Sequence, residues 1–358
     1  MIRDSKLRFM ALAVVATLGA ACDNGTEPGG LAGFDASGIS AGVDAAFAPI
    51  DASNPANFAL SSFLDWMAGG SSAVRAHEVT SRTPVTRIQS LMRQVGLDTE
   101  VDIPAEMRGQ TFVYDPVEEV WKPDETRTGA PVDGVRVIWY ATDDIGIVQP
   151  LDERGYIDLS DEDTATLDRL AVVIVRTAGT ITTLADFVHG YGATETETSW
   201  TETVEFSGTF SDGTTTAAVD ISLDASGTVE GDEVYVWNIF LASAETSYHW
   251  SLDGGYDPTG SYDEDLVVTV DHAAALTIID LHLTGSDVDG TGSGEGTLSH
   301  AGTTVANVTS GDQQYLFSRP GGGSFTAQEE NQLTLVTSTM LLYGPLMLIS
   351  LPLIFAAF

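Results

Sequence analysis

The sequence predicts an α+β fold dominated by β-strands, with one large curled antiparallel sheet. Between about 110 and 318, short apolar–polar alternations are separated by turn residues and by no segment of helical length, as in consecutive antiparallel strands. Helical spacing appears before residue 100, and a long apolar segment ends the chain. We therefore expect a single domain over 46–358, made of a helical cap (46–100), the sheet (110–318) and an apolar helical tail (326–358).

The N-terminal segment has the organisation of a secretion signal. Three basic residues lie in the first eight positions, and an apolar run over 9–18 is too short to span a bilayer. Small residues then lead to Cys22, the only cysteine. The segment resembles the lipobox of bacterial lipoproteins, with Leu18 one place further from the cysteine than the usual leucine.

This resemblance implies that residues 1–21 are removed between Ala21 and Cys22 and that the Cys22 thiol is acylated. The membrane would then be the partner, reached through lipid on Cys22, and we expect the outer membrane or the periplasmic face of the envelope. A single acyl chain binds a membrane weakly, so the anchor needs the fully acylated form. The alternative is an ordinary cysteine in a leader. Residues 22–45, rich in Gly, Ala and Ser, are expected to be a flexible tether.

The formal net charge is −37, and only 15 residues are lysine or arginine. A chain of this charge does not bind nucleic acid or anionic lipid through a basic patch. Because the acidic residues are spread along the whole chain, a solvated acidic surface is favoured over divalent-cation binding. The sequence predicts no cofactor.

Two helices are expected in the cap. Apolar residues recur near helical spacing over 55–67, before Gly69 and Gly70, and again over 85–95, before Gly96. The sheet is expected to begin with a hairpin over 111–121. Its clearest hairpin turns at Asp212 and Gly213, between alternating residues 202–210 and 219–223. Further strands are expected over 135–140, 146–148, 156–159, 167–176, 234–241, 246–252, 266–270, 276–283, 303–308 and 314–318.

No motif in the sequence identifies an activity. Gly38-Ile39-Ser40-Ala41-Gly42 matches the hydrolase pattern G-x-S-x-G, but no strand is expected before the serine, so we do not assign it a catalytic role. None of the six histidines forms H-E-x-x-H. His282 with Asp280, or His249 with Asp253, could contribute to a cross-strand metal site, although surface histidines among many acids are the favoured interpretation.

Asp287 and Asp289 resemble the start of a calcium loop, with Glu295 as a further ligand. The twelfth position of that loop is Leu298 rather than a bidentate glutamate, so an ordinary Asp-Gly turn is favoured. Glycines alternate at 290, 292, 294 and 296, which in a strand would strip one face of side chains. This pattern predicts either close packing or a sharp bend of the sheet, with a flexible loop as the alternative.

The C-terminal tail has no charge after Glu330 and is long enough to span a bilayer. Pro345 and Pro352 interrupt it, and no basic residue flanks it. We therefore favour two short helices that cover one face of the sheet over a membrane span.

The predicted function is a non-catalytic envelope lipoprotein. A curved sheet covered by helices is similar, at the level of the fold, to the half-barrel lipid carriers of bacterial envelopes, and this implies an apolar or amphiphilic ligand between sheet and helices. The alternative is a structural or interaction protein that displays an acidic sheet and holds no small ligand. A hydrolase or metal-dependent enzyme is the third and least favoured possibility.

Overall fold

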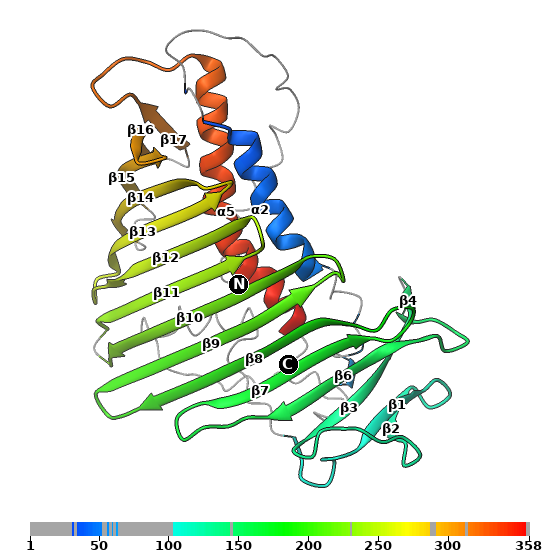
Figure 1. The fold of residues 1–358 in the computed structure, drawn as a ribbon. Helices are drawn as coiled ribbons and strands as arrows, with labels where there is room; N and C mark the ends of the chain where they lie inside the picture. The colour runs from blue at the N-terminus through cyan, green and yellow to red at the C-terminus, as the bar shows by residue number, and fades with distance from the viewer. Residues whose placement is uncertain are drawn as a thin grey trace.

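The computed structural model describes residues 31, 34–51, 56, 59, 62–63, 103–143, 146–229, 231–286, 291–311 and 314–355. Within these residues, fifteen strands form one open, curled sheet (Figure 1). The strands of this sheet are β1 (Thr111–Asp115), β2 (Val120–Pro123), β3 (Gly134–Tyr140), β6 (Glu153–Asp161), β7 (Asp168–Arg176), β8 (Thr182–Glu195), β9 (Ser199–Ser211), β10 (Thr216–Thr228), β11 (Glu233–Ala242), β12 (Thr246–Tyr256), β13 (Ser261–His272), β14 (Ala275–Ser286), β15 (Thr291–His300), β16 (Thr303–Gly311) and β17 (Gln314–Ser318). A separate pair is made by β4 (Thr142–Asp143) and β5 (Gly146–Ile147).

Nearly all of the predicted antiparallel meander is confirmed. From β6 to β17 every strand pairs antiparallel with the next strand in the chain. The exception is at the other end, where β1 lies between β2 and β3 and pairs parallel with β3 over two residue pairs. The sheet is therefore mixed, because β3 pairs with β1, the first strand of the hairpin, rather than with β2, the strand that precedes β3 in the chain.

Two helices, α2 (Ala36–Asp51) and α5 (Ala327–Phe355), lie side by side along one face of the sheet (Figure 1). We call this the inner face and the opposite one the outer face. Ser40 of α2 and Thr339 of α5 share a hydrogen bond of 3.0 Å between their hydroxyl oxygens. Among the described residues, no helix combines the length and apolar character that crossing a membrane requires.

The expected tether is wrong over residues 36–45, which belong to α2. The helix buries Ala36, Ile39, Val43, Ala46 and Ile50, a spacing of three and four residues that places all five on one side. Before the helix, the carboxylate of Asp35 accepts a 2.9 Å hydrogen bond from the Gly38 amide, as an N-cap does. This segment is therefore a packed helix, whose buried side chains are mostly small.

The tail forms one helix rather than the two that its prolines predicted, and Pro345 and Pro352 both lie within α5. Its start is fixed by a capping box: the Thr326 amide donates to the Glu329 carboxylate (2.8 Å), and the Glu329 amide donates to the Thr326 hydroxyl (3.3 Å). Over the turns that follow, Leu333, Val336 and Met340 are completely buried. This first part of the tail therefore packs into the core.

The inner face carries the core of the domain. On this face, Phe187, Phe206 and Phe210 of neighbouring rows form one aromatic cluster with ring centroids 5.0–6.1 Å apart. Phe187 belongs to β8, a fourteen-residue strand that the sequence analysis does not predict. The predicted alternation of β9 is confirmed, since Val204, Phe206 and Phe210 are all buried.

Three of the four alternating glycines lie in β15, so for these the flexible-loop alternative is wrong and close packing is confirmed, whereas Gly290 lies outside the described residues. Gly292, Gly294 and Gly296 all face inward, opposite Gly285, Leu283 and Leu281 of β14. The Tyr262 hydroxyl occupies the space that a Cβ at position 292 would fill, and the carbonyl oxygen of Asp280 does the same at Gly296. Glycine is thus needed where neighbouring strands approach this closely.

The remaining cap predictions fall mostly beyond these residues. Ala56, Ala59, Ser62 and Phe63 are helical, which agrees with the helix expected over 55–67. The helix expected over 85–95 and the signal segment 1–21 lie outside the described residues.

Candidate functional site

Most of the site residues that the sequence predicted lie outside the described residues. This applies to Ala21, Cys22, Asp287 and Asp289. Glu295 is described, and it lies on the outer face of β15, directly across from His282 of β14.

The G-x-S-x-G serine lies in the middle of α2, where Ser40 contacts Thr339. A nucleophile elbow needs a strained turn between a strand and a helix to expose the hydroxyl, and a serine inside a continuous helix lacks that geometry. The motif therefore reflects the small residues that let α2 and α5 approach each other.

Four histidines have polar or aromatic neighbours in the sheet. On the inner face, His272 shares a 2.8 Å hydrogen bond with Thr246, and His300 shares one of 2.9 Å with Thr277. His189 is buried on the same face, and desolvation lowers its pKa to about 4. On the outer face, His249 packs edge-on against Phe240.

On the outer face, His282 lies beside two carboxylates. Its Nδ1 lies 2.9 Å from the Asp265 carboxylate and 3.6 Å from that of Asp263. The hydrogen bond with Asp265 is the main cause of its raised pKa. Across the described residues, no group of three or more His, Cys, Asp or Glu side chains is arranged to hold a metal ion.

Carboxylates line up across the outer face of the sheet. One cross-strand row contains Asp224, Val236, Asp253, Asp265, His282 and Glu295, contributed by β10 to β15 in turn. We call its four acidic residues the carboxylate row (Asp224, Asp253, Asp265 and Glu295). Asp253 and Asp265 are directly opposite each other, an arrangement of like charges that destabilises a sheet.

Apart from His282, which pairs with Asp265, no basic side chain lies in this row, and its strands contain no lysine or arginine. None of the 15 lysines and arginines lies between residues 177 and 318, which span β8 to β17. From β8 to β15, every strand therefore carries acidic residues and no lysine or arginine. His282 can neutralise only part of this charge, so the rest of the row is stabilised by solvation or by an external cation.

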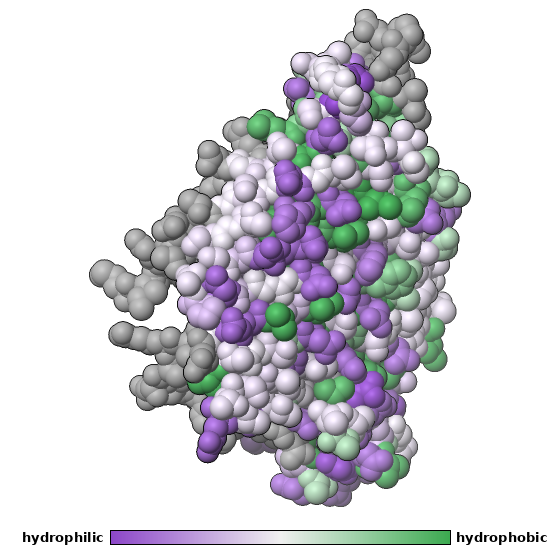
Figure 2. Space-filling model, turned by 90° about the vertical axis from the view of Figure 1, so that its left-hand side faces the viewer, coloured by the Kyte–Doolittle hydropathy of each residue, from purple (hydrophilic) through white to green (hydrophobic). Residues whose placement is uncertain are grey.

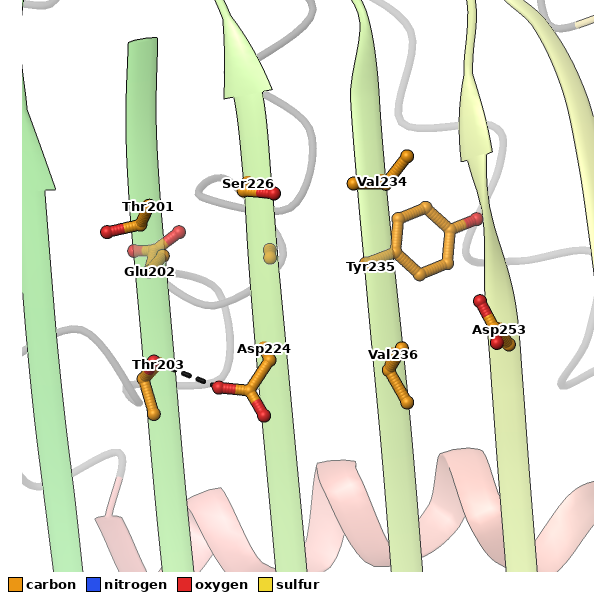
Figure 3. Close-up of a pocket in the computed structure, with 10 residues that line it drawn as sticks. Thr201, Glu202, Thr203, Asp224, Ser226, Val234, Tyr235, Val236 and Asp253 are labelled. Carbon is orange, nitrogen blue, oxygen red and sulfur yellow. Dashed lines mark hydrogen bonds between the residues drawn. The ribbon is translucent and has the colours of Figure 1, made fainter.

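A shallow depression lies at one end of the carboxylate row, and we call it the outer trough (Figure 3). It has a volume of about 490 Å³ and crosses β9 to β12. The outward side chains that line it are Thr201, Thr203, Asp224, Ser226, Val234, Val236 and Asp253.

The floor of the trough is apolar and its sides are acidic. Val234 and Val236 are 60% and 38% exposed, which is unusual for valines in the middle of a wide sheet. Val236 lies between Asp224 on β10 and Asp253 on β12 in the same row. The hydroxyl of Thr203 donates a 3.0 Å hydrogen bond to Asp224 and thereby orients that carboxylate (Figure 3).

Behind the trough, a partly buried polar pair links the strands on the inner face. Tyr235 donates a hydrogen bond from its hydroxyl to the Glu264 carboxylate, across the side-chain-free Gly254. Burial raises the pKa of Glu264. Tyr235, Tyr256 and Tyr262 follow one another in ring contact with centroids about 6 Å apart. The trough therefore has a rigid floor.

Figure 2 shows a side of the molecule on which hydrophobic side chains form small groups between hydrophilic ones. The trough combines the same two kinds of side chain at close range. Chemically, it can accept an aliphatic chain that ends in a positive charge, with methylenes on the valines and the charge between Asp224 and Asp253.

Comparison of the chain with known protein families, with curated proteins and with solved structures finds no match. The trough could not be predicted from the sequence, because its residues come from four strands. Alternation showed that each of them faces outward, but only the register of the strands shows which are neighbours.

Proposed function

We propose that this chain is a non-catalytic lipoprotein of a bacterial envelope, anchored through lipid on Cys22, which binds a lysine-bearing segment of another protein on the outer face of its sheet. The observation that carries the proposal is the carboxylate row beside the outer trough, in strands without a lysine or an arginine. Such a chain is an interaction protein that displays an acidic sheet, which is the alternative function that the sequence indicates.

The packing of the inner face favours this alternative over an apolar ligand held between sheet and helices. Val43 and Ala46 of α2, and Leu333 and Val336 of α5, are completely buried against the rest of the core. These side chains occupy the apolar surface that such a ligand would need. Among the described residues, no helix lies on the outer face (Figure 1), which is the surface on which a partner can dock.

Lysine fits the trough better than a simple metal ion does. Its four methylenes can lie on Val234 and Val236, while its ammonium group reaches the carboxylates on either side. Such contacts are mostly electrostatic and exposed, so we expect fast, salt-sensitive binding rather than high affinity.

Binding of a fluorescent octalysine peptide to the full chain tests this function. We expect binding that weakens as salt rises, and we expect the double variant Asp224→Asn/Asp253→Asn to weaken it roughly fivefold to thirtyfold, since exposed charge contacts contribute about 0.5–1 kcal/mol each. The matched control is Asp220→Asn/Asp271→Asn, which removes the same charge from exposed positions elsewhere on the outer face. Equal effects of the two double variants would contradict a role for the trough. No binding by the wild-type chain at moderate salt would refute the function itself.

The anchor has its own test. Changing Cys22→Ser removes the only thiol, so the variant should stay unprocessed and leave the detergent phase of a phase-partition experiment. If that variant is still processed and still enters the detergent phase, the chain is not a lipoprotein.

A further inference from the structure

The two edges of the open sheet differ in their protection against pairing with another strand. At one end, β2 carries Lys122 and Pro123, which are common devices against edge-to-edge association. Lys122 is held there by ion pairs of 2.7 Å with Asp115 and Glu118. At the other end, β17 has the sequence Gln-Tyr-Leu-Phe-Ser and contains neither device.

β17 is the last strand of the sheet, so among the described residues no strand lies along its outer edge. Leu316 is 64% exposed on the outer face, and Tyr315 is 37% exposed on the inner face. An uncharged edge strand with exposed apolar side chains is the pattern that pairs readily with another chain.

The charge of the chain limits which partner can reach this edge. No charged residue occurs in the described residues of β16 and β17, whereas β10 to β14 each carry acidic residues. With a net charge of −37, two copies of this chain repel each other in most orientations. Pairing through β17 is the approach that brings one uncharged strand against another.

We propose that a second copy of this chain pairs with β17 through its own β17, antiparallel and with Leu316 on the two-fold axis. This register places Leu316 opposite its own copy on the outer face. On the inner face, the same register places Tyr315 of each copy opposite Phe317 of the other copy. Residues directly opposite each other in an antiparallel pair lie on the same face of the sheet. The register therefore keeps Leu316 on the outer face and Tyr315 and Phe317 on the inner face, where the structure already places them.

The pairing joins two fifteen-stranded sheets into one continuous sheet. It also extends the inner-face row of Val308 and Phe317 from one copy into the next. Because the contact is isologous, it closes at two copies and does not propagate into a fibre.

Sedimentation velocity of the full chain, carrying Cys22→Ser so that lipid does not contribute, tests the dimer. We expect a dimer in moderate salt and a monomer for Leu316→Lys, because a lysine on the two-fold axis meets its own copy. The matched control is Val234→Lys, which places the same charge on a comparably exposed apolar position in the middle of the sheet. That variant should remain dimeric. A monomeric Cys22→Ser chain at every concentration, or a Leu316→Lys variant that is still a dimer, would overturn the proposal.

Disulfide trapping tests the register and does not depend on how a lysine affects folding. In the same cysteine-free background, Leu316→Cys should form a disulfide-linked dimer under mild oxidation, since directly opposite residues lie within disulfide range. Val234→Cys should not. Tyr315→Cys and Phe317→Cys should link to each other when the two variants are mixed, and neither should link to itself. Failure of Leu316→Cys to cross-link in a chain that sediments as a dimer would show that another surface holds the copies together.

Discussion

The hydroxyl of Tyr248 on β12 donates a 2.7 Å hydrogen bond to the backbone carbonyl of Met340 on α5, 92 residues further along the chain. Both residues are completely buried, and the Tyr248 ring also packs edge-on against Phe47 of α2. One side chain therefore ties the sheet to both helices.

Changing Tyr248→Phe should lower the free energy of unfolding by about 1–3 kcal/mol, because the ring is kept while a buried carbonyl loses a partner. Chemical denaturation of the two proteins measures the difference. The control is Tyr315→Phe at the exposed edge of the sheet, where we expect less than about 0.5 kcal/mol. An unchanged stability for Tyr248→Phe would mean that α5 does not depend on this bond.

The part of the fold that alternation governs could be predicted from the sequence. The Asp212–Gly213 hairpin is confirmed with Gly213 at φ +95° and with the Asp212 carboxylate accepting the Thr214 and Thr215 amides. The tail was expected to be helical from 326, and α5 begins at Ala327. Local pattern was sufficient here because turn residues and capping residues act on their immediate neighbours.

The elements that the sequence analysis missed depend on contacts between distant residues. β8 contains Gly190 and Gly192, which resemble a loop in isolation, yet Gly190 fits closely against Arg169 of β7 and Glu205 of β9. The buried positions of α2 do follow helical spacing, but most are alanine or valine, so composition suggested a tether. The outer trough depends on register across four strands, which no local pattern specifies.

The glycines of β15 allow a direct test of close packing. Changing Gly296→Ala places a Cβ against the backbone carbonyl of Asp280, so we expect a loss of about 1–3 kcal/mol of stability. At Gly311 on β16 there is nothing within 4 Å of an added Cβ. Gly311→Ala should therefore be neutral or slightly stabilising. Thermal and denaturant unfolding measure the stability of the two variants. If Gly296→Ala is no less stable than Gly311→Ala, β15 tolerates a side chain on its inner face.

His189 should make the protein less stable as pH falls. Its pKa is about 4 in the folded protein and near 6.5 when unfolded, so the unfolded chain takes up the proton first. The contribution of neutral His189 is complete above about pH 6.5 and is lost as pH falls toward 4, a change of roughly 3 kcal/mol. His189→Gln should remove this slope, and denaturation at several pH values between 4 and 7.5 measures it. A variant with the wild-type pH dependence would show that another group causes the slope.

His282 provides a comparison of opposite sign. Because Asp265 raises its pKa, any stability that it contributes is present below its unfolded pKa and is lost as pH rises through the folded value. His282→Gln should therefore lose stability at acid pH relative to neutral pH. The two histidine variants should shift the pH profile in opposite directions when they are measured under the same conditions.

The packing of α5 can be tested with two neighbouring residues of the same helix. Val336 is completely buried, whereas Leu335 is 38% exposed. Val336→Asp places an unpaired charge in the core beside α2, and a penalty of several kcal/mol is a large part of the usual stability of a domain, about 5–15 kcal/mol. We expect this variant to lose cooperative unfolding, to bind a dye for exposed apolar surface and to aggregate. Leu335→Asp makes the same chemical change one residue earlier, so it should fold and melt nearly as the wild type does. If both variants fold equally well, α5 does not contribute to the core, and the sheet must be stable without its helical cover.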